Sequence, residues 1–436
     1  MQYKSYHNQD RSQYDIGTIL IYLILCIVGI LTIYSSVFSE NAAWFDFKMP
    51  YTKQLIFLGI SVFMGIIILY TESNLFFHLG YVIFGLVIAL TAGTFLFGAT
   101  VNGAQAWYKI GGIQLQPAEF AKIGAVLGLS KYLGSYGVRL DSLRNYGIAF
   151  LFLFIPMGIV LAQNDTGSAL VFLSLILVLY RFGLPSWLLG IGVSYIVLFS
   201  VLMLISKNEA LLGLRPEYFL IAVITLIFIV LGALLARNNR KLITVLSILY
   251  ISYVGFVMVA NFAFNSLKGY QKRRIQLIYG LIEDRRGTGY NLFQSKVAIG
   301  SGQLTGKGYL GGTQTKLNFV PEPSTDFIFC TLAEETGFIG SSLFVLLYLY
   351  FLYRLAIMAE RQNSRFARAY GYGVFSILLF HFIINVGMTM GMVPTIGIPL
   401  PFISYGGSSL LAFTILLFIF IKLDANRGNE VSVDLR

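Results

Sequence analysis

Six charged side chains lie within long apolar stretches of this sequence, and their types suggest chemistry. They are five carboxylates and one amine: Glu119, Asp165, Asp326, Glu334, Glu335 and Lys122. A charge in a hydrocarbon environment costs at least about 2.5 kcal/mol on insertion scales, so such groups are functional candidates by default. Carboxylates held in this way can pair with a cation or accept a proton as a general base.

Glu119 and Lys122 are three residues apart on a helix that is expected to open at Pro117. This spacing places both side chains on one face, so they can form an ion pair. One interpretation is an internal pair that neutralises two charges and fixes helix packing. The other is a role facing the substrate or handling protons.

Asp165 precedes Thr166 and Gly167 at a predicted helix start. An Asp at this position is a good N-cap, because its carboxylate can accept a backbone N–H of the first turn. A polar site at the outer mouth of a cavity is the alternative.

Asp326 follows the segment 321–325, PEPST, where a long loop re-enters the membrane. It is either an N-terminal helix cap or a carboxylate at the depth of a lipid headgroup. Partial burial there would raise its pKa towards the range that a general base needs. Glu334 and Glu335 lie about two turns further on, and at most one of them can face Asp326. A structural role is expected for both.

The remaining polar residues give weaker signals. His78 and His381 are each expected to be helix-packing histidines, and the three histidines show no metal-ligand spacing. The two cysteines exclude a disulfide scaffold and a Cys-based zinc site. The glycine-rich segment 300–308 matches no nucleotide-binding motif, although its backbone amides and Lys307 could hold a lipid diphosphate.

The elements that must position these residues are membrane helices. Hydrophobic residues make up 57% of the 436 residues and charged residues 12%, about half the share in soluble domains. We therefore expect an all-α polytopic membrane protein, with 1–436 as a single integral membrane domain. The twelve predicted spans lie near 16–38, 54–71, 75–99, 117–134, 146–162, 166–181, 185–206, 216–236, 241–265, 326–354, 368–393 and 402–423.

The distribution of Lys and Arg predicts the orientation. With the N-terminus inside, sixteen of them fall in inside segments and five in short outside loops. Basic residues favour the cytoplasmic side, so both termini are predicted to be cytoplasmic. This topology explains much of the net charge of +11, so no nucleic acid is expected as a partner.

Residues 266–325 form one long connection on the outside, expected to be ordered as short amphipathic helices on the bilayer surface. An anionic lipid-linked substrate would explain its basic character. Its nine basic residues are Lys268, Lys272, Arg273, Arg274, Arg285, Arg286, Lys296, Lys307 and Lys316.

Several segments together resemble the SEDS family (shape, elongation, division and sporulation proteins), and the likeness runs from about residue 16 to 425. The first outer loop has NGAQAW at 102–107, and the next helix has QPAE at 116–119 with Lys122. QNDTGSAL at 163–170, the stretch 294–314 of the large loop and its end at 321–327 also match. PLPFISYGGS at 399–408 matches the last-helix motif. The GKGYLGGTQ form at 306–314 resembles the RodA-type elongation members more than the division members.

The resemblance implies a peptidoglycan glycosyltransferase in the bacterial cytoplasmic membrane that polymerises lipid II during cell elongation and rod-shape maintenance. Its expected partners are a class B penicillin-binding protein, which acts as transpeptidase, and elongation-complex membrane proteins such as MreC and MreD. The family's catalytic carboxylate falls on Asp326, its important tryptophan on Trp107, and its helix pair on Glu119 and Lys122. The matching QNDTGSAL segment adds Asp165 as a further residue expected to bind the substrate.

Three departures from the family pattern are apparent. The family usually has ten spans, so the pair within 207–265 is interpreted as an insertion before the large loop. Ala106 stands where an Arg often precedes the tryptophan, and Ser324 stands where a His often precedes the aspartate by two residues.

The implied mechanism is a one-step displacement with inversion. Asp326 would accept the proton of the acceptor's 4-hydroxyl as its oxygen attacks the donor's anomeric carbon, and undecaprenyl diphosphate would leave. The cations proposed for the diphosphate are Arg273, Arg274, Lys307 and Lys316. A divalent cation such as Mg²⁺ or Mn²⁺ could assist, although the sequence contains no metal-binding cluster. The alternatives are a lipid II flippase or ion-coupled transporter, and a non-catalytic scaffold for the penicillin-binding protein.

Overall fold

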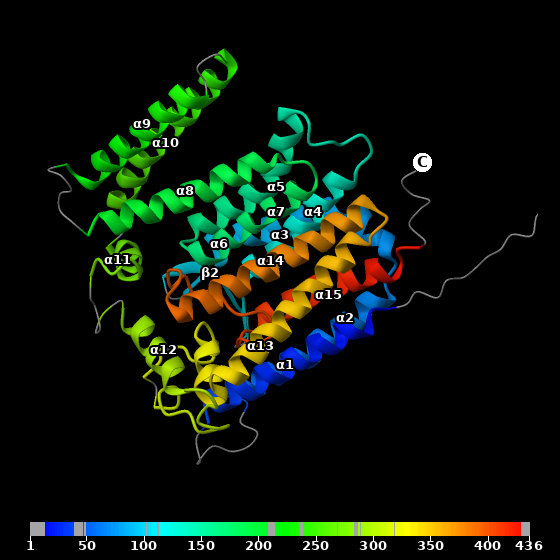
Figure 1. The fold of residues 1–436 in the computed structure, drawn as a ribbon. Coiled ribbons are helices and arrows are strands. Elements are labelled where there is room, and N and C mark those ends of the chain that lie inside the picture. Colours follow the sequence, from blue (N-terminus) through cyan, green and yellow to red (C-terminus); the bar gives the residue numbers. More distant parts are fainter. Residues whose placement is uncertain are drawn as a thin grey trace, which may run out of the picture. The chain divides into compact units, whose positions relative to one another are not determined.

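The computed structural model describes residues 14–38, 47, 49–101, 103–110, 113–207, 214–235, 239–267, 269–282, 287, 289–317 and 319–428. Asn102, Lys268, Arg285 and Arg286, which the sequence analysis names, lie outside these ranges. The described chain is mostly helical, as expected (Figure 1). It forms two compact units, which we call the larger and the smaller unit.

The larger unit comprises Met1–Leu184, Gln294–Met390 and Ile396–Arg436. Its elements are α1 (Ile16–Ser36), α2 (Pro50–Tyr70), α3 (Ser73–Phe97), β1 (Ala99–Val101), β2 (Ala104–Ile110), β3 (Ile113–Leu115), α4 (Pro117–Gly134), α5 (Leu143–Ala162), α6 (Thr166–Val171), η1 (Phe172–Leu175), α7 (Ile176–Arg181), α12 (Tyr290–Ser301), α13 (Ile328–Glu360), α14 (Arg365–Met390) and α15 (Gly407–Ala425). The first residues of α12 precede Gln294, where this segment of the larger unit begins.

The smaller unit comprises Pro185–Phe293 and Gly391–Thr395. Its helices are α8 (Ser186–Ile205), α9 (Pro216–Leu235), α10 (Arg240–Ser266) and α11 (Gly269–Ile278). Tyrosine hydroxyls of α10 join it to α8 and α9, with Ser194 Oγ 2.7 Å from Tyr253 OH and Thr225 Oγ1 3.1 Å from Tyr250 OH. The predicted insertion at 207–265 corresponds to α9 and α10, and its status as an insertion stays a prediction.

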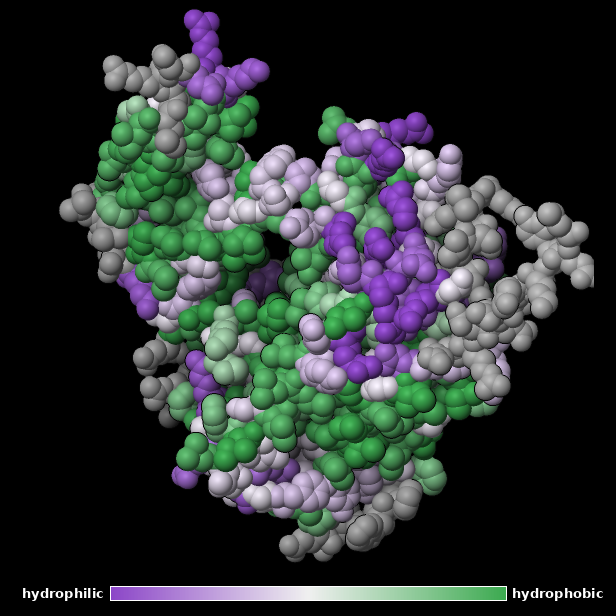
Figure 2. Space-filling view, turned by 45° about the vertical axis from the view of Figure 1, so that its right-hand side comes forward, coloured by the Kyte–Doolittle hydropathy of each residue, from purple (hydrophilic) through white to green (hydrophobic). Residues whose placement is uncertain are grey.

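Every predicted span is helical in the structure. Within the described ranges, ten helices are long and apolar enough to cross a membrane. The two predicted spans outside this group are α4 and the shorter apolar helix Thr166–Arg181. Both pack inside the larger unit, where almost every α4 residue is buried. The chain is a multi-pass membrane protein, and Figure 2 shows the broad hydrophobic areas that its surface presents.

The core of the larger unit is built around α4, α14 and α15. α4 packs against α3, α5, α14 and α15, and α14 also packs against α13 and α15. Figure 1 shows α14 running alongside α13. Small residues permit these close approaches: a Cβ added at Gly373 would lie 2.5 Å from Val126 Cγ1. This tight packing gives the polar groups of α4 and α14 fixed neighbours.

The connection between α3 and α4, predicted to be the first outer loop, contains three short antiparallel strands, which the sequence did not predict. β2 pairs with β1 and with β3. The strands end directly before α4, whose first residue is Pro117. A proline is well suited to the first turn of a helix, because its missing N–H has no partner there in any case. The sheet therefore fixes the entry into α4.

α13 is interrupted at Gly337, where φ is +65° and ψ is −164°. The connection 266–325, which we call the outer loop after its predicted side, closes the break with backbone hydrogen bonds. Phe338 N donates to Gln303 O at 2.8 Å and Ile339 N to Leu304 O at 3.0 Å. Non-helical backbone at membrane depth requires such protein partners. The described part of this loop also contains the helices α11 and α12.

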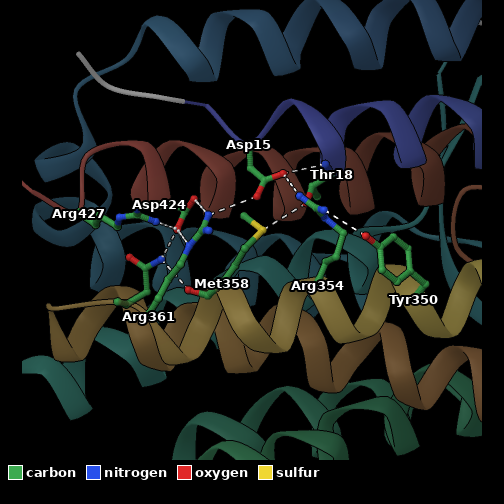
Figure 3. Close-up of polar contacts among 9 residues, drawn as sticks. Asp15, Thr18, Tyr350, Arg354, Met358, Arg361, Asp424 and Arg427 are labelled. Atoms are coloured by element: carbon green, nitrogen blue, oxygen red, sulfur yellow. Dashed lines mark hydrogen bonds and ion pairs between the residues drawn. The ribbon is translucent and has the colours of Figure 1, made fainter. Parts of the chain in front are cut away.

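A network of charged residues joins the start of α1 to the ends of α13 and α15 (Figure 3). Asp15 pairs with Arg354 and lies 3.3 Å from Arg361, which also pairs with Asp424. The Asp15 side chain accepts Thr18 N at 2.9 Å and so caps α1. Hydrogen bonding to Asp424 is the main cause that raises the pKa of Arg361.

Candidate active site

Asp326 lies at the end of the outer loop, two residues before the start of α13. The N-cap residue of this helix is Phe327, and no side chain caps it. Asp326 is therefore not the N-cap residue of this helix but the residue before it. Its side chain is only half-buried, which agrees with the alternative of a partly buried carboxylate at the end of the loop.

Gly397 forms one wall beside the Asp326 carboxylate. A Cβ added at this glycine would lie 3.0 Å from Asp326 Oδ2, and the φ of the glycine is +77°. Residues with a side chain rarely adopt such a φ, so the site needs glycine for its backbone and for its space. The segment 396–398 therefore lies directly against the carboxylate.

The last-helix motif holds the end of the outer loop in place. Ser404 Oγ donates to Thr325 O at 2.7 Å, and Tyr405 N donates to Ser324 O at 2.8 Å. We call this contact between residues 324–326 and 396–405 the joint. Ser324, which stands where a histidine is frequent in the family, is buried and contributes its backbone carbonyl to the joint. Two motifs about 80 positions apart in the sequence thus form one structure.

Asn385 of α14 connects the same two segments. Its Nδ2 donates to Asp326 O at 3.0 Å and to Ile398 O at 2.8 Å. The asparagine is fully buried. It was not among the residues singled out from the sequence.

Asp165 has the capping role that its position predicts. Its Oδ1 accepts Ser168 N at 3.0 Å at the start of α6, while its Oδ2 accepts Gln116 Nε2 at 2.7 Å. The QPAE and QNDTGSAL motifs therefore meet through this carboxylate. A Cβ added at Gly167 would lie 3.0 Å from Ile396 O, so the start of α6 also packs against the segment beside Asp326.

Glu119 and Lys122 form a buried ion pair, with Lys122 Nζ 2.8 Å from Glu119 Oε2 and each side chain 2% exposed. Lys122 Nζ also lies 3.1 Å from His381 Nε2 and 4.6 Å from the centre of the Phe413 ring. The other ring nitrogen of His381 lies 3.0 Å from Pro399 O. These contacts match the internal-pair interpretation and link it to the segment next to Asp326.

Lys307 and Glu334 form a second ion pair at 2.6 Å, with Glu334 fully buried and Lys307 26% exposed. The Glu334 carboxylate also accepts the backbone N–H groups of Thr313, Gln314 and Thr315 at 2.8, 2.9 and 3.1 Å. Lys307 of the glycine-rich segment and the backbone of 313–315 therefore both bind a carboxylate of the protein itself. The exposed part of Lys307 still faces the surface.

Glu335 and Lys316 support the same loop. Glu335 accepts a hydrogen bond from Ser35 of α1 and one from Leu310 N at 3.0 Å. Lys316 donates to Leu310 O, and its Nζ lies 4.8 Å from the centre of the Phe38 ring. Both adjacent glutamates thus have the structural role that was expected.

Trp107 lies in β2 and pairs across the sheet with Ala99 of β1. Its side chain is half-buried, whereas the neighbouring Ala106 is fully buried. An arginine, as the family often has before the tryptophan, would not fit at Ala106 without rearrangement.

Arg273 and Arg274 belong to α11 of the smaller unit. Arg273 is exposed, and Arg274 Nη1 donates to Thr395 O at 2.8 Å. Arg273 thus lies at the surface of that unit, whereas Arg274 is half-buried.

Among the residues that the structure describes, no group of three or more His, Cys, Asp or Glu side chains could hold a metal ion. The groups that meet around residues 396–404 are backbone carbonyls, the Asn385 amide and the Asp326 carboxylate. The residues that sequence reasoning missed are Asn385, Gly397 and Ser404. Only the spacing of His381 and Asn385, one helical turn apart on α14, gave a signal that could have indicated one of them.

Comparison with known proteins identifies relatives that span nearly the whole chain. The family model of the FtsW/RodA/SpoVE group, described as cell cycle protein, matches residues 17–214 and 210–429. The peptidoglycan glycosyltransferase RodA of Treponema pallidum is 34% identical over 436 residues, covering 95% of this chain and 98% of the relative. The peptidoglycan glycosyltransferase MrdB of Escherichia coli K12 is 33% identical over 341 residues, covering 78% and 76%.

Solved structures share the fold. A chain from a study of a peptidoglycan synthase complex that coordinates polymerisation and crosslinking has a TM-score of 0.69 at 24% identity, covering 96% of this chain and 99% of that one. The crystal structure of the rod-shape-determining protein RodA of Thermus thermophilus has a TM-score of 0.60 at 22% identity, covering 95% and 97%. With its motifs joined around Asp326 and its relatives matching along nearly its full length, the chain belongs to the FtsW/RodA/SpoVE family of cell cycle proteins.

Proposed function

We propose that this peptidoglycan glycosyltransferase polymerises lipid II on the outer face of the cytoplasmic membrane, with Asp326 as its general base. The observation that carries the proposal is the position of Asp326. The aspartate ends the outer loop at a joint made by the last-helix motif and α14. A base acts efficiently only when it is held within hydrogen-bonding reach of the proton that it removes.

In the proposed step, the 4-hydroxyl oxygen of the acceptor sugar forms a bond to the anomeric carbon of the donor glycan. The bond from that carbon to the diphosphate oxygen breaks, and undecaprenyl diphosphate leaves with the electron pair. Asp326 takes the hydroxyl proton. A single displacement inverts the anomeric centre and requires no covalent intermediate with the enzyme.

Negative charge accumulates on the leaving diphosphate and must be stabilised by cations. Arg273, Arg274, Lys307 and Lys316 are the residues that we propose for this role. Lys307 is partly neutralised by Glu334, so its contribution is the smallest of the four if the ion pair persists during the reaction.

The other substrate-side residues are given narrower roles. Two roles are proposed for Trp107 from its half-buried position in β2: it stacks on a sugar or prenyl segment, or it anchors the loop at the membrane interface. Glu119 and Lys122 act from inside the bundle through their contact with His381. Asp165 holds the start of α6 and Gln116 together at the joint.

We also propose that both termini are cytoplasmic and that the chain works with a class B penicillin-binding protein. MreC and MreD are proposed as further members of the elongation complex. The relative amounts of Lys and Arg on the two sides support the orientation. A structural neighbour's description as part of a synthase complex for polymerisation and crosslinking supports the pairing.

The test is polymerisation of defined lipid II by the purified chain, with and without the penicillin-binding protein. The expected products are glycan strands and undecaprenyl diphosphate, with one diphosphate released for each glycosidic bond formed. Movement of lipid II across vesicles without polymer would support a flippase instead. Polymer that depends only on the active site of the partner would support a scaffold.

A further inference from the structure

We propose that α14 positions Asp326 through two side chains one turn apart, Asn385 and His381, and that the buried Glu119–Lys122 pair acts on catalysis through this connection. The inference rests on the proposed role of Asp326 as the base. It concerns residues that do not touch the reacting atoms, so they are positioning residues.

The Asn385 amide ties the base to its surroundings. Both hydrogens of its Nδ2 group are used, one towards Asp326 O at 3.0 Å and one towards Ile398 O at 2.8 Å. The same amide therefore fixes the residue that carries the carboxylate and the segment next to Gly397, which faces that carboxylate. One side chain therefore binds both backbone segments that border the site.

Burying an asparagine at this position costs free energy. It is fully buried, and its Oδ1 has no hydrogen-bond partner within the part of the chain that the structure describes. A buried polar atom left without a partner costs about 1 to 3 kcal/mol. An apolar residue of similar shape would avoid that cost, so the two donated hydrogen bonds are the reason to keep an amide here.

His381 secures the same segment from one turn earlier. Lys122 is an ammonium donor, so His381 Nε2 at 3.1 Å must accept from it. The imidazole hydrogen then lies on Nδ1 and is donated to Pro399 O at 3.0 Å. Glu119 fixes Lys122 at 2.8 Å, so the ion pair selects the tautomer that holds Pro399.

These contacts form a continuous path within the larger unit. It runs from Glu119 through Lys122 and His381 to the backbone of Pro399 and Ile398, and through Asn385 to Asp326. Small displacements of a catalytic group have large effects on rate, because productive geometry is narrow. We therefore expect a loss in kcat when the path is broken, without a matching loss in lipid II binding.

The chain offers a matched control for Asn385. Gln362 is also fully buried, its Nε2 donates to Met358 O at 2.8 Å and to Asp424 Oδ1 at 2.7 Å, and its Oε1 likewise has no partner among the described residues. It belongs to the charged network at the ends of α13 and α15. Gln362→Leu removes an equivalent amide away from the joint.

The experiment compares Asn385→Leu and Gln362→Leu in the full-length protein with its partner, at a temperature where both variants are folded. We expect Asn385→Leu to lower kcat at least about tenfold with KM for lipid II within about twofold, and Gln362→Leu to keep both near wild type at a similar fall in Tm. Equal losses of kcat in the two variants, or a change in KM alone, would overturn the positioning role.

Histidine variants keep the inference testable if Asn385→Leu does not fold. His381→Asn can still donate to Pro399 O, whereas His381→Leu cannot. We expect His381→Asn to retain at least about fivefold more kcat than His381→Leu, and equal activity would contradict the path. Wild type and Asp326→Asn are measured alongside. If wild type makes no polymer, the proposed function itself fails, and this inference fails with it.

Discussion

The ammonium of Lys307 lies 2.6 Å from Oε1 of Glu334, a fully buried carboxylate in the broken helix α13. Three backbone N–H groups of the outer loop, from Thr313 to Thr315, donate to the same carboxylate. Lys307, which the sequence suggests as a ligand of a diphosphate, thus already pairs with a side chain of the protein. Glu334 organises the loop from within the membrane helix.

Glu334→Gln is therefore expected to loosen the outer loop. The new amide presents N–H groups to backbone N–H donors, and Lys307 loses its anionic partner. Removing one member of a buried ion pair typically costs about 3 to 5 kcal/mol. Thermal unfolding in detergent should show a clearly lower Tm, and limited proteolysis should become faster within 302–317. Glu322→Gln, at an exposed glutamate of the same loop, is the control, and equal Tm values for the two variants would contradict this role.

Gly337→Ala tests the break in α13. The φ of +65° with ψ of −164° is accessible almost only to glycine, and an added Cβ would lie 2.2 Å from Gly306 N. We expect destabilisation of more than about 1 to 3 kcal/mol, because the backbone strain and the clash add. Gly300→Ala on α12, where an added Cβ meets nothing within 4 Å, should leave Tm near wild type. A continuous, stable helix in Gly337→Ala would show that the break is not required.

The charged network at the end of α1 predicts a pH dependence of stability (Figure 3). Burial by itself raises the pKa of Asp15, but hydrogen bonds from the Thr18 backbone and Arg354 outweigh it and bring the pKa below the ordinary 3.8. A carboxyl group with a lowered folded pKa contributes stability above its unfolded pKa and loses it as the pH falls through the folded value. Tm should therefore fall below about pH 4, and Asp15→Asn should make that fall shallower. Asp141→Asn, at an exposed carboxylate, should leave the slope unchanged; the same slope in Asp15→Asn and wild type would contradict the assignment.

Sidedness can be measured with single cysteines. The two native cysteines, Cys26 and Cys330, are buried, so their background labelling should be low. Lys296→Cys on α12 should react with a membrane-impermeant maleimide added outside, and Gly428→Cys only after the membrane is opened. The reverse pattern would show that the proposed orientation is inverted.

The helices were predictable because each depends on local information. Uncharged runs of about twenty residues form helices in a membrane whatever their neighbours, and residues such as Asp165 and Pro117 mark helix starts by their own chemistry. The pairing of Glu119 with Lys122 was predictable from a spacing of three.

The joint around Asp326 could not be predicted in the same way. Asn385 and Ser404 bind backbone carbonyls at positions far away in the sequence, and no local pattern reveals such partners. Gly337 looks like any glycine in an apolar run, although its φ breaks the helix. The three strands of the first outer loop are short and depend on one another for hydrogen bonds.

The most direct test of the central claim compares Asp326→Asn with Glu322→Gln in the purified protein with its partner. Both substitutions remove one carboxylate from the same end of the outer loop, and Tm and expression are checked for each. Glycan strands and released undecaprenyl diphosphate are quantified from defined lipid II. The account predicts that Glu322→Gln polymerises near the wild-type rate and that Asp326→Asn is slower by at least about 10² to 10⁴. A folded Asp326→Asn protein that polymerises lipid II at the wild-type rate would contradict the assignment of Asp326 as the general base.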